Sequence, residues 1–239
     1  MSDESVTEES IEPQADSEPV ATEVSTFRLV ATLAVAGTLA GLLIVMMNQH
    51  TKPIIDKYKA EQLRKAVYEV LPGVDRYSTL YLVNEALSLT LPEGVKESEY
   101  KRIYAGYGGD GQLGGVAISR GESGFQDVVQ IIFGFDPETG KLLGMKVLDS
   151  KETPGLGDKI FKDQSFVEQF FARPDTPLLG VKPGAGKGLS NEIDTITGAT
   201  ISSKVVIDII NHGLEIWRPV IDKGIPSVPS ESADVEVTP

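Results

Sequence analysis

The sequence predicts an α+β protein in which a single N-terminal transmembrane helix precedes a domain of strands and helices. Three observations support this prediction. The 19-residue stretch Leu29–Met47 contains no charged side chain. Five shorter runs have the apolar, β-branched character of strands, and three further segments carry apolar residues at helical spacing. A chain of 239 residues has room for one sizeable domain with appendages.

Both ends of the chain are predicted to be disordered tails. Residues 1–26 contain eight acidic residues and no basic one, and residues 223–239 add three acids after Lys223. Such segments bury too little apolar surface to fold alone. The tails carry most of the net charge of -13, and no basic stripe elsewhere indicates nucleic-acid binding.

A transmembrane helix is predicted over residues 27–48. At ~1.5 Å per residue, its uncharged part spans roughly 28 Å, enough to cross the hydrocarbon core of a bilayer. The preceding segment is acidic and no small-residue cleavage site follows, so we expect an uncleaved single-pass anchor rather than a signal peptide. A juxtamembrane helix is then predicted over residues 49–72, because apolar residues recur at helical spacing until Pro72-Gly73.

The domain over residues 73–222 is predicted to begin with strands. The strand-like runs are Tyr77–Val83, Leu87–Leu91, Gly114–Ile118, Val128–Phe135 and Leu142–Leu148. Residues 136–140, Asp-Pro-Glu-Thr-Gly, give a hairpin turn between the last two runs. An amphipathic helix is predicted over Phe161–Phe171, with Phe166, Val167, Phe170 and Phe171 on one side. A Gly/Pro-rich loop and short-strand region over Pro174–Ser190 and a helix from Thr200 to about Val220 complete the domain.

Composition limits the chemistry. The chain has no cysteine, which excludes disulfides, thiol catalysis and cysteine-ligated iron–sulfur clusters. Only His50 and His212 are present, so haem and multi-histidine metal sites are poor interpretations. We predict no metal ligand and no catalytic residue, and any electron transfer requires an organic cofactor.

The stretch Asp194-Thr195-Ile196-Thr197-Gly198-Ala199-Thr200 is a short polar turn directly before a helix. Small residues at Gly198 and Ala199 let a bulky group lie against the backbone. The helix N-terminus offers N–H donors and partial positive charge to an anion, so the Thr200 hydroxyl lies where a phosphate is stabilised. The alternative is an ordinary capped loop-to-helix junction.

A second informative stretch is Lys151–Lys159, which contains Glu-Thr-Pro-Gly-Leu-Gly at residues 152–157. Pro154-Gly155 indicates a tight turn, and Gly157 permits a close approach of backbone. Leu156 is an apolar side chain among turn residues, which a flat apolar ring would cover. The alternative is a structural turn with Leu156 in the core.

The first stretch matches every defined position of the D-x-x-[ST]-G-A-[ST] flavinylation motif, in which a transferase esterifies the FMN phosphate onto the last hydroxyl. Together with E-T-P-G-L-G, it resembles the FMN-binding domain shared by the G subunit of the Rnf electron-transport complex and the C subunit of the sodium-pumping NADH:quinone reductase. Residues 152–160 look closer to the former, and the resemblance covers roughly residues 28–220.

This resemblance implies an FMN-binding α+β domain with a largely antiparallel sheet. It implies that Thr200 carries FMN covalently through the phosphate, after the action of an FMN transferase. The residues implied to line the flavin are Glu152, Thr153, Leu156 and Gly157. Those implied to hold it beside Thr200 are Thr197, Gly198 and Ala199. Asp194 is implied to orient the turn or to serve recognition by the transferase.

The resemblance further implies a flavoprotein subunit of an ion-translocating oxidoreductase complex, relaying electrons between ferredoxin and NAD with the other subunits. This chain alone is expected to turn over no substrate. The implied location is the bacterial inner membrane, with the large domain on the periplasmic side. The positive-inside rule predicts the opposite side, since Arg28 is the only base before the span and five bases follow it by Lys65.

Other interpretations remain open. The near alternative is the C subunit of the sodium-pumping reductase, and a different class is a non-redox, membrane-anchored binding protein whose Thr200 loop holds a free phosphate ligand. A scaffold with two purely structural motifs is the third. Gly184–Gly188 fails the Walker A pattern, and His212 lies ~18 Å along one helix from Thr200, which is too far to act as its base.

Overall fold

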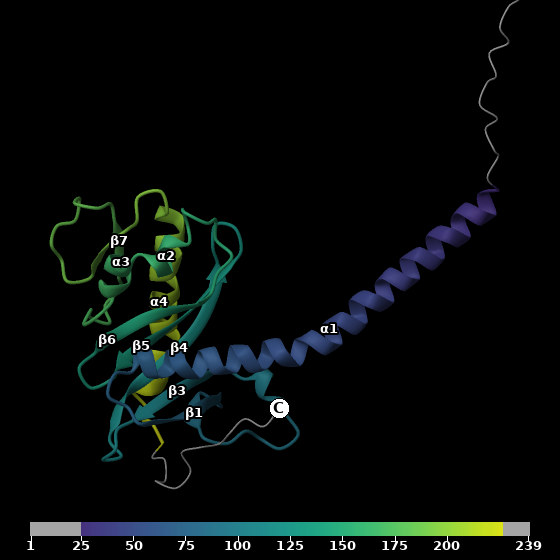
Figure 1. The fold of residues 1–239 in the computed structure, drawn as a ribbon. Helices are drawn as coiled ribbons and strands as arrows, with labels where there is room; N and C mark the ends of the chain where they lie inside the picture. The colour runs from purple at the N-terminus through teal and green to yellow at the C-terminus, as the bar shows by residue number, and fades with distance from the viewer. Residues whose placement is uncertain (1–24, 227–239) are drawn as a thin grey trace, which may run out of the picture. The chain divides into compact units, whose positions relative to one another are not determined.

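A computed structural model of the chain describes residues 25–226. Apart from residues 25–26 and 223–226, the tails predicted over 1–26 and 223–239 lie outside the described residues. The elements are α1 (Thr26–Val70), β1 (Arg76–Val83), β2 (Ala86–Ser88), η1 (Glu97–Glu99), β3 (Arg102–Tyr107), β4 (Leu113–Ser123), β5 (Val128–Asp136), β6 (Lys141–Asp149), α2 (Lys159–Lys162), α3 (Gln164–Glu168), β7 (Leu179–Val181), β8 (Glu192–Asp194) and α4 (Thr200–Ile221) (Figure 1).

The chain divides into two units, one that ends at Ile54 and one that begins at Ile55. The described part of the first unit is the N-terminal part of α1, whose apolar side chains are almost all exposed. Its best 18-residue window has a mean hydropathy of 2.4. By length and composition, this helix can cross a membrane, since a helix satisfies all its backbone hydrogen bonds internally.

The second unit is built on a six-stranded sheet in the order β2-β1-β3-β4-β5-β6, with every neighbouring pair antiparallel. A separate parallel pair joins β7 to β8. The predicted α+β class, with a largely antiparallel sheet after one apolar N-terminal helix, is therefore confirmed.

Both faces of the sheet carry buried apolar side chains, because successive side chains of a strand point to opposite faces. Helix α4 packs on one face, where Phe133 and Ile118 join the larger buried cluster with Ile209, Ile210 and Trp217. Gly213 lets α4 approach closely, since a Cβ at this position would lie 2.8 Å from Phe133 Cζ.

The other face is covered by the last turns of α1. There Ala66, Val67 and Val70 are buried with Tyr104 and Ile132 of the sheet in a second cluster. An apolar cluster therefore lies on each side of the sheet, as in a layered domain. The loops at the ends of the strands are available to form a binding site.

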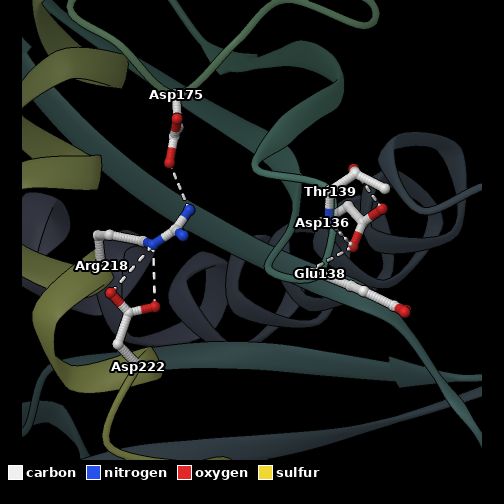
Figure 2. Close-up of polar contacts among 6 residues, drawn as sticks. All are labelled: Asp136, Glu138, Thr139, Asp175, Arg218 and Asp222. Carbon is white, nitrogen blue, oxygen red and sulfur yellow. Dashed lines mark hydrogen bonds and ion pairs between the residues drawn. The ribbon is translucent and has the colours of Figure 1, made fainter.

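Charged groups fasten the C-terminal end of α4 to the loop after α3. Figure 2 shows the Arg218 guanidinium between the carboxylates of Asp175 and Asp222, and it also lies 5.1 Å from the centre of the Phe135 ring. The β5–β6 hairpin in the same view is held by Asp136, which accepts hydrogen bonds from the amides of Glu138 and Thr139.

Several predicted elements differ from the structure. The helices predicted over residues 27–48 and 49–72 are the single helix α1, and Asp194, predicted in the turn, is the last residue of β8. Helix Phe161–Phe171 is two short helices, because Asp163 adopts an extended conformation and caps α3 by accepting from the Ser165 amide. Phe171 is exposed rather than packed with Phe166 and Phe170. Strand β3 was missed altogether, although it lies between β1 and β4 near the centre of the sheet.

Candidate functional site

The turn that precedes α4 places Thr200 at the first position of the helix. Gly198 has a φ of +83°, a left-handed conformation that favours glycine, and the Ala199 amide donates to the Ile196 carbonyl at 3.0 Å. Ala199 is buried, whereas Thr197, Gly198 and Thr200 are exposed. The threonine hydroxyl is thus presented at the surface by a turn whose geometry depends on glycine.

The N-terminus of α4 is free to bind an anion. The first intrahelical hydrogen bond runs from the Ser203 amide to the Ala199 carbonyl, at 2.9 Å. The amides of Thr200, Ile201 and Ser202 therefore have no acceptor within the helix. Ala199 is the N-cap and offers no capping side chain, so Thr200 is not the cap of an ordinary junction. Amides at this end of a helix favour a phosphate group.

Buried hydroxyl groups fix the shape of the turn. Ser203 Oγ accepts from the Ile196 amide at 3.0 Å and donates to the Ala199 carbonyl at 2.9 Å. Thr195 bonds the Val181 carbonyl through both its amide, at 2.8 Å, and its hydroxyl, at 3.0 Å. The turn is therefore tied to α4 on one side and to the end of β7 on the other.

The Glu-Thr-Pro-Gly-Leu-Gly loop closes on Asp158, the residue just before α2. Asp158 accepts a hydrogen bond from the Gly155 amide at 2.7 Å and one from Lys162 Nζ at 2.6 Å. The hydrogen bond from Lys162 is the main reason that the pKa of Asp158 is lowered. Gly155 itself has a φ of +78°, which explains a glycine at this place in the turn.

The carboxylate of Glu152 joins three segments of the site. Its Oε1 accepts from the amides of Phe125 and Gln126, at 2.9 and 3.1 Å, and its Oε2 accepts from Ser202 Oγ at 2.7 Å. The residue is only 6% exposed. The β4–β5 hairpin, this loop and the first turn of α4 are therefore held by one buried carboxylate, at the end of the domain where α4 begins (Figure 1).

Two glycines make room for this carboxylate. A Cβ at Gly124 would lie 2.3 Å from Glu152 Oε1, and a Cβ at Gly157 would lie 2.5 Å from Glu152 Oε2. Both distances are far below van der Waals contact. The close approach expected at Gly157 is thus an approach to the side chains of Glu152 and Ser202.

The two motifs meet at Leu156 and Gly198. A Cβ built at Gly198 would lie 3.7 Å from Leu156 Cδ2, so the leucine side chain reaches the glycine of the turn. Leu156 is 50% exposed and is not a core residue. An apolar side chain therefore lies open to solvent beside the turn that presents Thr200.

The remaining predicted residues lie nearby with different contacts. The main chain of Asp194 bonds the Gln169 side chain twice, at 2.7 and 3.1 Å, and its carboxylate makes no hydrogen bond or ion pair with other described residues. Thr153 Oγ1 donates to Gln126 Oε1 at 3.0 Å. Sequence reasoning missed Ser202, although a pair of serines in the first turn of an apolar-faced helix was a signal.

The rejected alternatives have structural explanations. Glu192 Oε2 accepts from the amides of Gly188 and Leu189, at 2.9 and 3.1 Å, so the glycine-rich loop already surrounds a carboxylate. His212 Nδ1 lies 2.9 Å from Glu122 Oε1 and is engaged there. Over residues 25–226, no cluster of histidine, aspartate and glutamate could hold a metal ion.

Comparison with known proteins connects this geometry to a family. Residues 124–215 match the FMN-binding domain family. The chain is 28% identical over 194 residues to the G subunit of the Na(+)-translocating ferredoxin:NAD(+) oxidoreductase complex of Acetobacterium woodii, covering 80% of this chain and 91% of that one. It is 30% identical over 186 residues to the G subunit of the ion-translocating oxidoreductase complex of Photorhabdus laumondii, covering 76% of this chain and 85% of that one.

Among solved structures, the chain resembles NqrC of Shewanella oneidensis, with a TM-score of 0.58 and 15% sequence identity. The match covers 70% of this chain and 100% of that one. At this level of identity, the likeness supports the fold alone.

Proposed function

The chain belongs to the family of G subunits of ion-translocating oxidoreductase complexes. We propose that it carries FMN on Thr200 and relays electrons between ferredoxin and NAD. One observation supports this proposal above all: Thr200 is exposed at the N-terminus of α4, beside an exposed Leu156 and next to amides without a partner in the helix. Bound FMN supplies a ring that takes up and releases electrons singly or in pairs.

Attachment of the cofactor is a phosphoryl transfer to the threonine. A bond forms between Thr200 Oγ1 and phosphorus, and the hydroxyl proton is lost. The donor is therefore a flavin nucleotide whose phosphate carries a leaving group, brought by a dedicated FMN transferase. The bond between phosphorus and that group breaks, and the group departs with the bonding electron pair and takes up a proton. The amides of Thr200, Ile201 and Ser202, which have no acceptor within the helix, would face the charge that remains on the phosphate diester.

The other residues of the site orient the ring. Leu156 offers apolar surface at the turn, and Gly198 lets the ring lie close to the backbone. Glu152 acts indirectly, by positioning the loop, because its buried carboxylate is bonded to three protein donors and holds the loop against α4. Thr153 and Gly157 support the same loop, one through Gln126 and the other by leaving space for Glu152.

The chain is a membrane-anchored protein, and its partners are the other members of the complex. We propose that the large domain lies on the periplasmic side of the inner membrane, where a covalent bond keeps the cofactor from being lost. The stretch Leu29–Met47 has no ionisable side chain, so an ion pathway requires other subunits. A reporter fused after Pro239 tests the side of the membrane.

The decisive experiment is expression of the full chain with an FMN transferase, followed by flavin fluorescence on a denaturing gel and intact mass. We expect a fluorescent band with the FMN increment in the wild-type chain, its loss in Thr200→Ala and its retention in Thr200→Ser. Thr176→Ala is the matched control, since Thr176 is an exposed threonine outside both motifs. No flavin in the wild-type chain, with the transferase active on another substrate, would overturn the proposal in favour of a non-redox phosphate-binding protein.

A further inference from the structure

The tip of the β4–β5 hairpin, residues 124–127, makes polar contacts with Lys151, Glu152 and Thr153 at every position after Gly124. The amides of Phe125 and Gln126 donate to Glu152. The Gln126 side chain accepts from Thr153, and Asp127 pairs with Lys151 Nζ at 2.8 Å. The backbone of the hairpin tip is therefore held in one place relative to the loop.

Despite this anchoring, Phe125 is 67% exposed. The same holds for one large apolar residue on each segment that Glu152 joins: Leu156 in the loop is 50% exposed, and Ile201 in the first turn of α4 is 54% exposed. Single exposed apolar residues are common on protein surfaces. Three of them lie on the three segments that are held by one buried carboxylate, and Ile201 directly follows Thr200.

We propose that Phe125 is a flavin-binding residue, forming an apolar wall that covers the isoalloxazine ring together with Leu156. This inference rests on the proposed function. The match to the FMN-binding family begins at residue 124, so the hairpin tip belongs to the part of the chain that the family shares. A tricyclic ring is a suitable partner for Phe125, because aromatic groups pack face to face with an offset or edge to face, and both arrangements need a partner whose backbone is fixed.

The mechanism of this contact is exclusion of water from one face of the flavin. The phenyl ring makes no polar contact with the cofactor, and it acts by shielding the ring. Water stabilises negative charge better than an apolar side chain does. Removing Phe125 is therefore expected to open the flavin to solutes and to shift its reduction potential to a more positive value.

The test uses the full chain flavinylated at Thr200, in detergent, with Phe125→Ala, Phe125→Leu and the control Phe171→Ala. Phe171 is 61% exposed and follows α3, and it makes no hydrogen bond to Glu152 or to the residues bonded to Glu152. Quenching of flavin fluorescence by iodide is expected to rise about twofold in Phe125→Ala, because a second face of the ring becomes open. Phe125→Leu is expected to restore much of the protection.

The outcomes separate this inference from the proposed function. Wild-type chain without the FMN mass increment would overturn both. Wild-type chain that carries FMN, with Phe125→Ala matching Phe171→Ala in iodide quenching and in reduction potential, would overturn the role of Phe125 alone. Emission from the buried Trp217 reports whether each variant is folded. If Phe125→Ala is unfolded, iodide quenching and the reduction potential are compared between Phe125→Leu and Phe171→Ala instead.

Discussion

Replacing Glu152 with alanine is expected to destabilise the domain more than any other single carboxylate removal at this site. The change leaves three donors without their acceptor: the amides of Phe125 and Gln126 and the hydroxyl of Ser202. Each unsatisfied buried donor costs about 1–3 kcal/mol. The two amides are only partly buried and water can reach them, so the expected total is about 3–5 kcal/mol.

Glu152→Gln separates the hydrogen bonds from the charge. One amide oxygen can still accept from the two backbone donors, and the Ser202 hydroxyl can turn to accept from the new NH₂ group. The expected loss is about 1 kcal/mol, the difference between a charge-assisted hydrogen bond and a neutral one.

The assay is urea unfolding of the full chain in detergent, followed by the emission of Trp217, the only tryptophan and a buried one. Glu215→Ala is the control, since Glu215 is an exposed glutamate on α4. If Glu152→Ala unfolds at the same urea concentration as Glu215→Ala, the carboxylate does not hold the three segments together and the reasoning is wrong.

Three further changes test separate parts of the structure. Gly198→Ala should cost about 1–2 kcal/mol of stability at a φ of +83°, and an unchanged urea midpoint would contradict that turn. The Lys162 hydrogen bond lowers the folded-state pKa of Asp158, so its stabilisation is present above about pH 3.9 and is lost as pH falls through the folded value. Asp158→Asn should flatten the acid side of the stability profile, whereas an unaltered profile refutes the link. Gly213→Ala should cost about 1–3 kcal/mol against Phe133, and equal midpoints would exclude that contact.

Much of the fold could be predicted because it depends on neighbours within a few residues. The uncharged stretch Leu29–Met47 needs no partner to be recognised, and α1 contains it. The hairpin turn at residues 136–140 depends on Asp136 and Gly140, which has a φ of +64°. The start of α4 at Thr200 follows from a glycine in the left-handed region just before an apolar periodic run.

Predictions failed where a local pattern was ambiguous. Strand β3 contains Ala105 and Gly106, which have weak strand character, and it exists because its backbone pairs with β1 and β4 on both sides. The apolar spacing from Phe161 to Phe171 favours one helix, but the carboxylate of Asp163 caps a new helix instead. In both cases, hydrogen bonds outweighed the periodicity of the side chains.

The sequence by itself identified the two segments of the candidate site: the turn that ends in Thr200 and the loop around Leu156. Only the tertiary structure decided how they meet. Glu152 is 27 residues from Phe125 and 50 residues from Ser202. No local sequence pattern predicts the hydrogen bonds that join these residues. A hydrogen bond depends on the distance between two atoms in space, and the packing of the sheet, the loop and α4 sets that distance.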